Sequence, residues 1–215
     1  MPDKKQPLHR TSGRTGGAFL PTKHGEFTAY AYPNSGGGEA HLALVHGNLH
    51  TDEPVLVRVH SECLTGDTLG SLRCDCGPQL ERALQEIGAA PAGVLLYMRQ
   101  EGRGIGLAAK IEAYMLQETG TDTYDANVLL GYPPDGRDYR QAADILRDLG
   151  VRRVALLTNN PAKSSALRAE GIDVAREVPL EIAPGQHNWR YLAVKRQRFG
   201  HRLRLRAGGA AAGAQ

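Results

Sequence analysis

Residues 58–79 read Arg-Val-His-Ser-Glu-Cys-Leu-Thr-Gly-Asp-Thr-Leu-Gly-Ser-Leu-Arg-Cys-Asp-Cys-Gly-Pro-Gln, and the rest of the chain is organised around this stretch. It holds all 3 cysteines of the sequence, Cys63, Cys74 and Cys76. An odd number of thiols is a poor basis for a disulfide framework, but it suits zinc. A structural zinc site is usually closed by four protein ligands, whereas a catalytic site has three and leaves one position for water.

Other interpretations of this spacing stay open. The thiols fit a buried apolar cluster equally well, or a structural zinc site whose fourth ligand is His60 or a more distant histidine. The neighbouring residues favour the catalytic site, because they crowd polar and ionisable groups into a segment that a structural zinc would not require. These residues are Arg58, His60, Ser61, Glu62, Asp67, Arg73 and Asp75.

Length and composition indicate one globular domain. The chain has 215 residues, of which 41% are hydrophobic and 23% charged, and its net charge of +3 is too small to argue for nucleic acid. No apolar run approaches the roughly 20 residues of a membrane span. The start of the chain lacks a secretory signal, and so few cysteines suit the reducing cytoplasm. We expect a flexible basic arm (1–24), a main domain (25–203) and a disordered tail (204–215).

The first half of the domain has the pattern of antiparallel strands. Residues 26–32 alternate between apolar and polar side chains, and residues 40–45 and 54–59 follow as further strands. The intervening Pro-Asn-Ser-Gly-Gly-Gly at 33–38 is typical of a hairpin. After the cysteines the period becomes helical, with Leu80, Leu84 and Ile87 on one face and Gly88 ending the helix.

The second half alternates strands with helices. Strands are predicted at 93–98, 153–157 and 174–180, and residues 121–138 are expected to be irregular. Helices follow a glycine-rich turn at 99–106, start again near residue 142, and begin at Pro161, with Asn160 as the N-cap. We therefore predict an α/β (mixed α+β) fold, in which antiparallel N-terminal strands lead into a mixed sheet covered by helices.

Several residues outside the cysteine stretch have both a functional and a plain structural interpretation. The turn at 99–106 fits a phosphate loop or an ordinary strand–helix turn, and Arg137 fits a functional loop or a surface ion pair. Lys163, with Thr158 and Asn160, fits a phosphate cradle or an exposed lysine. Tyr114 shares an apolar stripe with Leu107, Ile111 and Met115, so packing in the core competes with a place in a cleft.

Taken in order, these pieces resemble the GTP cyclohydrolase II family, whose members open the guanine ring at the first step of riboflavin synthesis. The motifs that carry the resemblance are those at 58–67, 71–77, 99–107 (Arg-Gln-Glu-Gly-Arg-Gly-Ile-Gly-Leu), 135–139 (Asp-Gly-Arg-Asp-Tyr) and 156–161 (Leu-Leu-Thr-Asn-Asn-Pro). They cover residues 25–203. Trp189 and Phe199 depart from the family pattern, which leaves substrate-edge contacts or dimer packing in question rather than the chemistry.

The resemblance implies a set of site residues. It implies zinc on Cys63, Cys74 and Cys76, and catalytic roles for Asp135 as proton acceptor, Arg137 as nucleophile toward the α-phosphate, and Tyr114. It implies GTP contacts from Arg58, Val59, His60, Ser61, Glu62, Gln79, Glu101, Gly102, Arg103, Thr123, Thr158 and Lys163. Because a guanidinium with a pKa above about 12 has no free lone pair, we expect Arg137 to stabilise charge instead.

The resemblance also implies Mg²⁺ with the triphosphate, a homodimer, and a stand-alone form without the dihydroxybutanone-phosphate synthase domain of many bacterial relatives. No nucleic acid or membrane partner is expected. The expected reaction is zinc-dependent opening of GTP at C8 with release of formate and pyrophosphate. Two alternatives are a variant that retains the formyl group and a non-catalytic protein that binds zinc and nucleotide.

Overall fold

The computed structural model describes residues 13–205, and its centre is one seven-stranded mixed sheet. Its strands are β1 (Ala18–Thr22), β2 (Gly25–Tyr32), β3 (His41–Gly47), β4 (Val55–Ser61), β5 (Ala92–Met98), β6 (Arg153–Leu157) and β7 (Asp173–Val178). They lie in the order β1-β2-β3-β5-β4-β6-β7. The pairs β1–β2, β2–β3 and β3–β5 are antiparallel. The pairs β5–β4, β4–β6 and β6–β7 are parallel. The predicted α/β class is confirmed.

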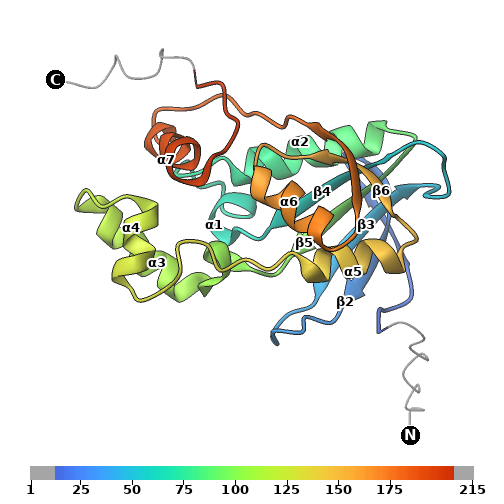
Figure 1. Cartoon of the computed structure of the whole chain (residues 1–215), viewed down its shortest axis with the longest axis horizontal. Coiled ribbons are helices and arrows are strands. Elements are labelled where there is room, and N and C mark those ends of the chain that lie inside the picture. The colour runs from blue at the N-terminus through green and yellow to red at the C-terminus, as the bar shows by residue number, and fades with distance from the viewer. Residues whose placement is uncertain (1–12, 206–215) are drawn as a thin grey trace, which may run out of the picture.

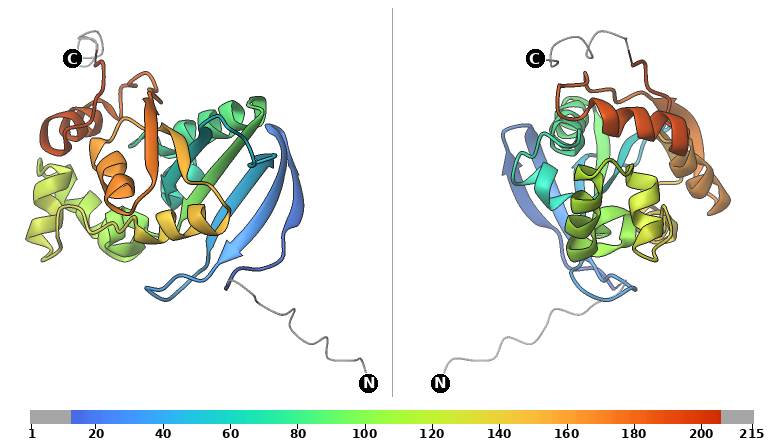
Figure 2. Two further views of the ribbon diagram at one scale, coloured as in Figure 1. Left: turned by 45° about the vertical axis from the view of Figure 1, so that its right-hand side comes forward. Right: turned by 90° about the vertical axis from the view of Figure 1, so that its left-hand side faces the viewer.

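Helices cover both faces of this sheet and extend beyond one end of it (Figures 1 and 2). They are α1 (Leu64–Asp67), α2 (Cys76–Ala89), the 3₁₀ turn η1 (Glu101–Gly104), α3 (Gly106–Glu118), α4 (Thr123–Leu129), α5 (Arg140–Asp148), α6 (Pro161–Ala169) and α7 (Trp189–Phe199). Helix α2 packs on one face, and α5 and α6 pack on the other. Figure 2 shows α3, α4 and α7 gathered beyond the end of the strands.

Alternation along the central strands builds two separate apolar cores. Val94 and Leu96 of β5 face the core beneath α5 and α6, whereas Leu95 between them faces the core beneath α2. All three side chains are almost completely buried, which is why β5 has a continuous apolar sequence. Packing on both faces restricts the motion of β5, so the residues that follow its carboxyl end start from a fixed position.

The carboxyl ends of the parallel strands create the natural place for a site. Strand β4 leads to α2 on one face, and its parallel neighbour β6 leads directly to α6 on the other face. The chain therefore diverges beyond these two strand ends and leaves a crevice between them. In open α/β sheets, ligands bind in such a crevice.

The sequence does not predict β1, α4, α7 or the short helix α1. Strand β1 lies within the arm expected to be flexible, α4 lies within the segment expected to be irregular, and α7 was not assigned. Pro21 obscures β1, because proline interrupts strands except at sheet edges, and β1 is an edge strand paired only with β2. The parts of the predicted arm and tail at 1–12 and 206–215 lie outside the described residues.

The expected inward stripe of α3 is wrong. The buried residues of α3 are Ala109, Lys110 and Ala113, whereas Leu107, Ile111 and Met115 are 40–64% exposed. The small alanines let the helix approach its neighbours closely, so the large apolar side chains point outward. Within the described residues, no helix is long and apolar enough to cross a membrane.

Gly88 provides a stability test of the packing of α2. A Cβ added at Gly88 would lie 1.8 Å from the backbone oxygen of His24 in the turn between β1 and β2. Glycine to alanine normally favours a helix by about 1 kcal/mol. Here we expect Gly88→Ala to be destabilising by about 1–3 kcal/mol, because backbone must move to relieve the overlap.

Thermal or urea unfolding of Gly88→Ala checks this prediction. Gln85→Ala, at an exposed position of the same helix, is the matched control and should unfold close to the parent. A Gly88→Ala protein as stable as the parent would contradict the packing described.

Candidate active site

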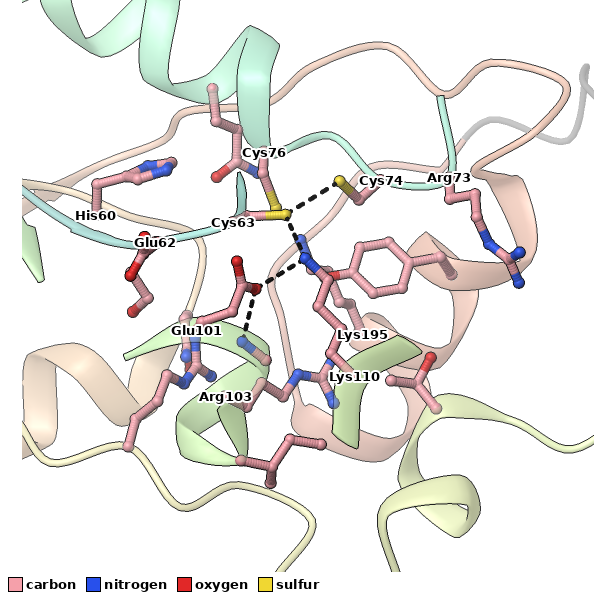
Figure 3. A pocket seen from close by; sticks show the side chains of 18 of the residues that line it. His60, Glu62, Cys63, Arg73, Cys74, Cys76, Glu101, Arg103, Lys110 and Lys195 are labelled. Carbon is pink, nitrogen blue, oxygen red and sulfur yellow. Dashed lines mark hydrogen bonds and ion pairs between the residues drawn. The ribbon is translucent and has the colours of Figure 1, made fainter. Parts of the chain in front are cut away.

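A pocket of about 1070 Å³, counting the part open to solvent, lies at the carboxyl ends of β4, β5 and β6 (Figure 3). Most of the residues expected from the sequence line it together: Arg58, His60, Ser61, Glu62, Cys63, Cys74, Cys76, Gln79, Glu101, Gly102, Arg103, Tyr114, Thr123, Arg137, Thr158 and Lys163. Val59 and Asp135 do not line it. The Val59 side chain is buried in the core, and the Asp135 carboxylate accepts a hydrogen bond from Arg137.

The three thiols form one cluster at the start of α1 and α2. Cys63 is the N-cap residue of α1, and Cys76 is the first residue of α2. Their sulfur atoms and that of Cys74 all lie within 4.8 Å of one another. Gly66 permits this approach, because a Cβ there would lie 2.7 Å from the sulfur of Cys74. Gly77 lets the start of α2 come close to α1, because a Cβ added at Gly77 would lie 2.3 Å from the carbonyl oxygen of Gly66.

The cluster has the dimensions of a zinc site. The sulfur atoms of Cys63 and Cys74 are 3.7 Å apart. With Zn–S bonds of about 2.3 Å, two ligands of a tetrahedral ion lie ~3.8 Å apart. Hydrogen bonds from the other thiols lower the pKa of Cys63, while the bond with Cys63 raises the pKa of Cys74 to about 11. Without a cation the three thiols cannot all ionise, so the cluster fits a divalent metal that stabilises thiolates.

A buried network fixes the loop that carries Cys63. The Asp67 carboxylate accepts hydrogen bonds from the backbone N–H of Cys63 at 2.9 Å and from the Tyr97 hydroxyl at 2.9 Å. It also accepts from His60 Nε2 at 3.0 Å. Burial is the main cause that lowers the pKa of His60, so the imidazole is neutral and its Nδ1 is left as an acceptor. Among the described residues, this buried Nδ1 has no hydrogen-bond partner.

Lys110 places a positive charge against the thiol cluster. Its ammonium group donates to the Cys63 sulfur at 3.2 Å and to Glu101 Oε1 at 2.8 Å (Figure 3). It also donates to Thr65 Oγ1 at 2.9 Å. Glu101 in turn accepts from the backbone N–H of Leu64. A zinc ion with three thiolates carries one net negative charge, which the Lys110 ammonium would balance. Such outer partners orient metal ligands and tune their basicity.

The pocket also carries an excess of positive charge, from Arg58, Arg103, Arg137, Lys163 and Lys195. Arg58 donates to the carbonyl of Leu157 and Lys163 donates to that of Val59, so neither is paired with a carboxylate there. Burial first, and then the nearby cations, lowers the pKa of Lys163 well below its ordinary value. A pocket of this kind favours a multivalent anion.

Two loops are held together where Arg103 and Arg137 emerge. Arg103 has a φ of 62°, the one non-glycine residue with positive φ in residues 13–205. Its carbonyl accepts from the N–H of Gly136, and a Cβ on Gly104 would lie 2.9 Å from the Gly136 oxygen. Backbone strain of this kind persists where the surroundings over-determine it, often at functional sites. The contacts of Arg103 and Gly104 with Gly136 hold Arg103 against the loop that carries Arg137.

Arg137 is not a surface ion pair, and Lys163 is not an exposed lysine. The Arg137 side chain is only 11% exposed and donates through Nε to Asp135 Oδ1 at 2.8 Å. Burial lowers its pKa, but Tyr139 and Asp135 outweigh burial and raise it above the ordinary value. The guanidinium is therefore charged, and the Asp135 carboxylate fixes its plane.

Tyr114 faces the pocket rather than the core. Its hydroxyl lies 3.3 Å from Thr65 Oγ1, and its ring lies beneath the guanidinium of Arg73 at 4.3 Å. Thr65 also contacts the Cys63 sulfur and Lys110. The hydroxyl therefore belongs to the same hydrogen-bonded group as the thiols.

Among the pocket residues that sequence reasoning missed, four are ionisable: Lys110, Tyr191, Lys195 and His201. Lys110 precedes Tyr114 by one helical turn, a spacing that places both on one face of α3, and this signal was available. The other three come from α7 and the turn after it. Their sequence is rich in arginine and lysine, which is typical of a solvated helix.

Comparison with known proteins is consistent with this geometry. Residues 14–179 match the protein-family model described as GTP cyclohydrolase II. The chain is 55% identical over 186 residues to the riboflavin biosynthesis protein RibBA of Bacillus cytotoxicus, covering 86% of this chain and 47% of that protein. It is 56% identical over 187 residues to RibBA of Salinispora arenicola, covering 86% and 44%. The chain thus spans about half the length of these curated relatives.

A test of the thiol cluster is removal of one ligand. We expect about one zinc per chain in the parent protein and loss of zinc in Cys74→Ser, because two thiolates hold the ion too weakly. Metal analysis after gel filtration measures this, and Ser71→Ala in the same loop should keep its zinc. A Cys74→Ser protein that retains stoichiometric zinc would contradict the assignment.

Proposed function

This chain belongs to the GTP cyclohydrolase II family, and from that membership we propose that it hydrolyses GTP at C8 of the imidazole ring. The products are formate, pyrophosphate and 2,5-diamino-6-ribosylamino-4(3H)-pyrimidinone 5′-phosphate. The observation that carries the proposal is one pocket that holds both a three-thiol cluster and several cations, of which Arg58 and Lys163 are bonded to backbone carbonyls and not to a carboxylate. GTP presents a purine ring and a triphosphate, which require these two environments.

The thiol side serves the base. Cys63, Cys74 and Cys76 would hold zinc, and bound zinc supplies the Lewis acidity that makes water a nucleophile near neutral pH. Addition of water at C8 opens the ring to a formamide, and a second hydrolysis releases formate. Tyr114, Glu62 and His60 lie around this side, and we assign them to orienting the base and the attacking water. The free Nδ1 of His60 suits an N–H of the guanine.

The cation side serves the phosphates. A triphosphate with a charge near −4 requires several fixed cations, which supports roles for Arg58, Arg103, Arg137 and Lys163. Mg²⁺ would complete the neutralisation. We assign further GTP contacts to the backbone or side chains of Val59, Ser61, Gln79, Glu101, Gly102, Thr123 and Thr158. Anion binding would also favour the ammonium form of Lys163, whose pKa burial lowers in the free protein.

Arg137 and Asp135 act together at the α-phosphate in this proposal. The charged guanidinium stabilises the negative charge that develops as pyrophosphate leaves, and Asp135 holds it in orientation. Burial raises the pKa of Asp135, but the hydrogen bonds from Arg137 outweigh it and lower the value below the ordinary range. Asp135 is thus a carboxylate that can accept a proton only when the pair separates.

Two alternatives remain within the same pocket. A variant enzyme would stop at the formamide, and a non-catalytic protein would bind zinc and nucleotide only. Incubation of the purified protein with GTP and Mg²⁺, followed by assays of formate, pyrophosphate and product absorbance, separates all three. Pyrophosphate without formate indicates the variant, and neither product indicates the binding protein. The reducing cytoplasm is the compartment we propose, because thiol ligands must stay reduced.

The two sides of the pocket should be separable by mutation. We expect Arg137→Ala to bind zinc normally and to release pyrophosphate roughly 10²- to 10³-fold more slowly, as for loss of a charge-stabilising donor. Arg140→Ala is the matched control, because Arg140 also pairs with an aspartate two residues earlier but is exposed. Zinc loss in Arg137→Ala, or pyrophosphate release at the parent rate, would contradict this division.

The hydroxyl of Tyr114 should act in the reaction rather than in packing. Tyr114→Phe keeps the ring, so we expect a melting temperature near that of the parent. Formate release should fall by roughly tenfold to a hundredfold, the effect of losing one or two good hydrogen bonds in a transition state. Tyr132→Phe, at an exposed tyrosine, should behave as the parent. Unchanged formate release from Tyr114→Phe would assign the residue to packing.

We also propose that the chain forms a homodimer through α3 and α4. Six of the ten exposed large apolar residues in the described part of the chain lie on these helices or directly after α4: Leu107, Ile111, Met115, Val128, Leu129 and Tyr132. The resemblance to a family that is usually dimeric supports a second copy as the partner. Isolated apolar side chains are normal on a surface, but a concentration on two helices packed together marks an interface.

The double variant Ile111→Glu, Met115→Glu tests this interface. We expect sedimentation velocity to show a dimer for the parent and a monomer for this variant, because burying carboxylates at an interface is costly. Phe19→Glu on β1 is the control, because Phe19 is 66% exposed at the far edge of the sheet. A variant that remains dimeric would place the interface elsewhere.

A further inference from the structure

Helix α7 forms part of the pocket although it lies outside the matched residues 14–179. Figure 2 shows α7 beside the group formed by α3 and α4, beyond the end of the sheet. From it and the turn that follows, Tyr191, Lys195 and His201 line the same pocket as the thiols and cations. Lys195 is labelled in Figure 3.

Contacts with three other parts of the chain fix α7 in this place. Arg103 lies over the ring of Phe199, with its guanidinium carbon 3.9 Å from the ring centroid. Arg198 donates to Asp125 on α4 at 2.7 Å. After the helix, the N–H of Arg202 donates to the carbonyl of Asn159 at 2.8 Å.

Gly200 directs the next residue into the pocket. It has a left-handed φ of 65° and ends α7. Its N–H and that of His201 both donate to the carbonyl of Lys195, which reverses the chain direction. His201 therefore follows the helix directly and lies among the pocket cations. Burial, followed by the charges of Lys195, Arg137, Lys163 and Arg103, lowers the pKa of His201 to about 2.

Lys195 is a buried cation with spare hydrogen-bonding capacity. Its ammonium donates to Asp75 Oδ1 at 2.6 Å and lies 4.5 Å from the ring centroid of Tyr191. An ammonium has three N–H donors, and Asp75 uses one of them. Asp75 lies between two of the thiols in sequence, so Lys195 touches the segment that bears them while facing the cations.

We propose that Lys195 and His201 are further substrate-binding residues, which contact the polyphosphate group of the nucleotide. This inference rests on the proposed function and adds a fifth cation and an imidazole from α7 to the phosphate side of the pocket. The geometry supports it, because four cations from separate elements (Arg58, Arg103, Arg137 and Lys163) line the same pocket as these two side chains. A bound polyanion relieves the repulsion among them, and the remaining donors of Lys195 are available to it.

Binding of inorganic pyrophosphate and of guanosine to the full-length protein, measured by calorimetry, tests the inference without any turnover. We expect Lys195→Met to weaken pyrophosphate binding by roughly ten- to a hundredfold, the effect of losing hydrogen bonds to a charged group. His201→Ala should also weaken it, while guanosine binding and zinc content stay at the parent level. Arg196→Met is the matched control, because Arg196 is an exposed cation on the same helix.

Lys195→Met leaves the Asp75 carboxylate without its ammonium partner, so the experiment must distinguish a folding defect from the loss of a phosphate contact. Lys195→Arg keeps the charge and should restore most of the pyrophosphate affinity. His201→Ala leaves the pair with Asp75 intact and gives an independent reading. Parent-level pyrophosphate binding in both Lys195→Met and His201→Ala would overturn the inference, as would equal losses of guanosine and pyrophosphate affinity.

Failure of the proposed function has a different signature. A parent protein that binds pyrophosphate but releases no formate from GTP contradicts the proposed function, and the binding comparison among variants still decides the role of α7. A parent protein that binds no pyrophosphate at all overturns the inference itself.

Discussion

Buried positive charge is the constraint on which the pocket depends. Arg58 and Lys163 are nearly inaccessible to solvent, and their hydrogen bonds go to backbone carbonyls and, for Arg58, to the amide oxygen of Gln79 rather than to carboxylates. Burying charge without a counter-ion is costly, so the free protein gives up stability here. The sheet provides the compensation, because two apolar cores hold β4, β5 and β6 firmly enough to fix their carboxyl ends. An anion that enters the pocket would offset this cost.

The same loops serve the thiols and the cations, which links the two sides of the pocket. Asp75 lies between Cys74 and Cys76 and joins Lys195 and Gln79, and Gln79 bonds Arg58. On the other side, Glu101 fixes Lys110 and the backbone of α1, while its neighbour Arg103 contacts α7. The cations of the pocket are therefore connected by hydrogen bonds to the segments that carry the three thiols.

Local patterns in the sequence predicted the central architecture and the thiol cluster. Alternation identified β2 to β4, the apolar run identified β5, and Asn160 with Pro161 marked the start of α6, where Asn160 does cap the helix. Resemblance supplied Gln79, Thr123 and Arg137 as pocket residues, which no local spacing indicates. Their roles in GTP hydrolysis stay predictions.

Long-range packing explains what the sequence did not reveal. The stripe of Leu107, Ile111 and Met115 has the period of a core-facing helix, yet α3 turns its small residues inward. Helical period shows that a face is apolar, but not what covers it. His201 enters the pocket because Gly200 reverses the chain and the N–H of Arg202 bonds the carbonyl of Asn159 just after β6, and Lys195 enters it through the placement of α7. Such contacts between distant segments leave no signal in the spacing of residues.

The placement of the ends of residues 13–205 matters to anyone handling this protein. In Figure 1 these residues begin and finish at opposite ends of the molecule. They begin beside β1, at the sheet edge farthest from β7, and finish shortly after His201, which lines the pocket. A bulky label or solid support fixed at residue 205 would lie only four residues from His201 of the pocket lining. Attachment at the opposite end of residues 13–205 keeps it away from that lining, so sensors or immobilised catalysts built from this chain should be tethered there.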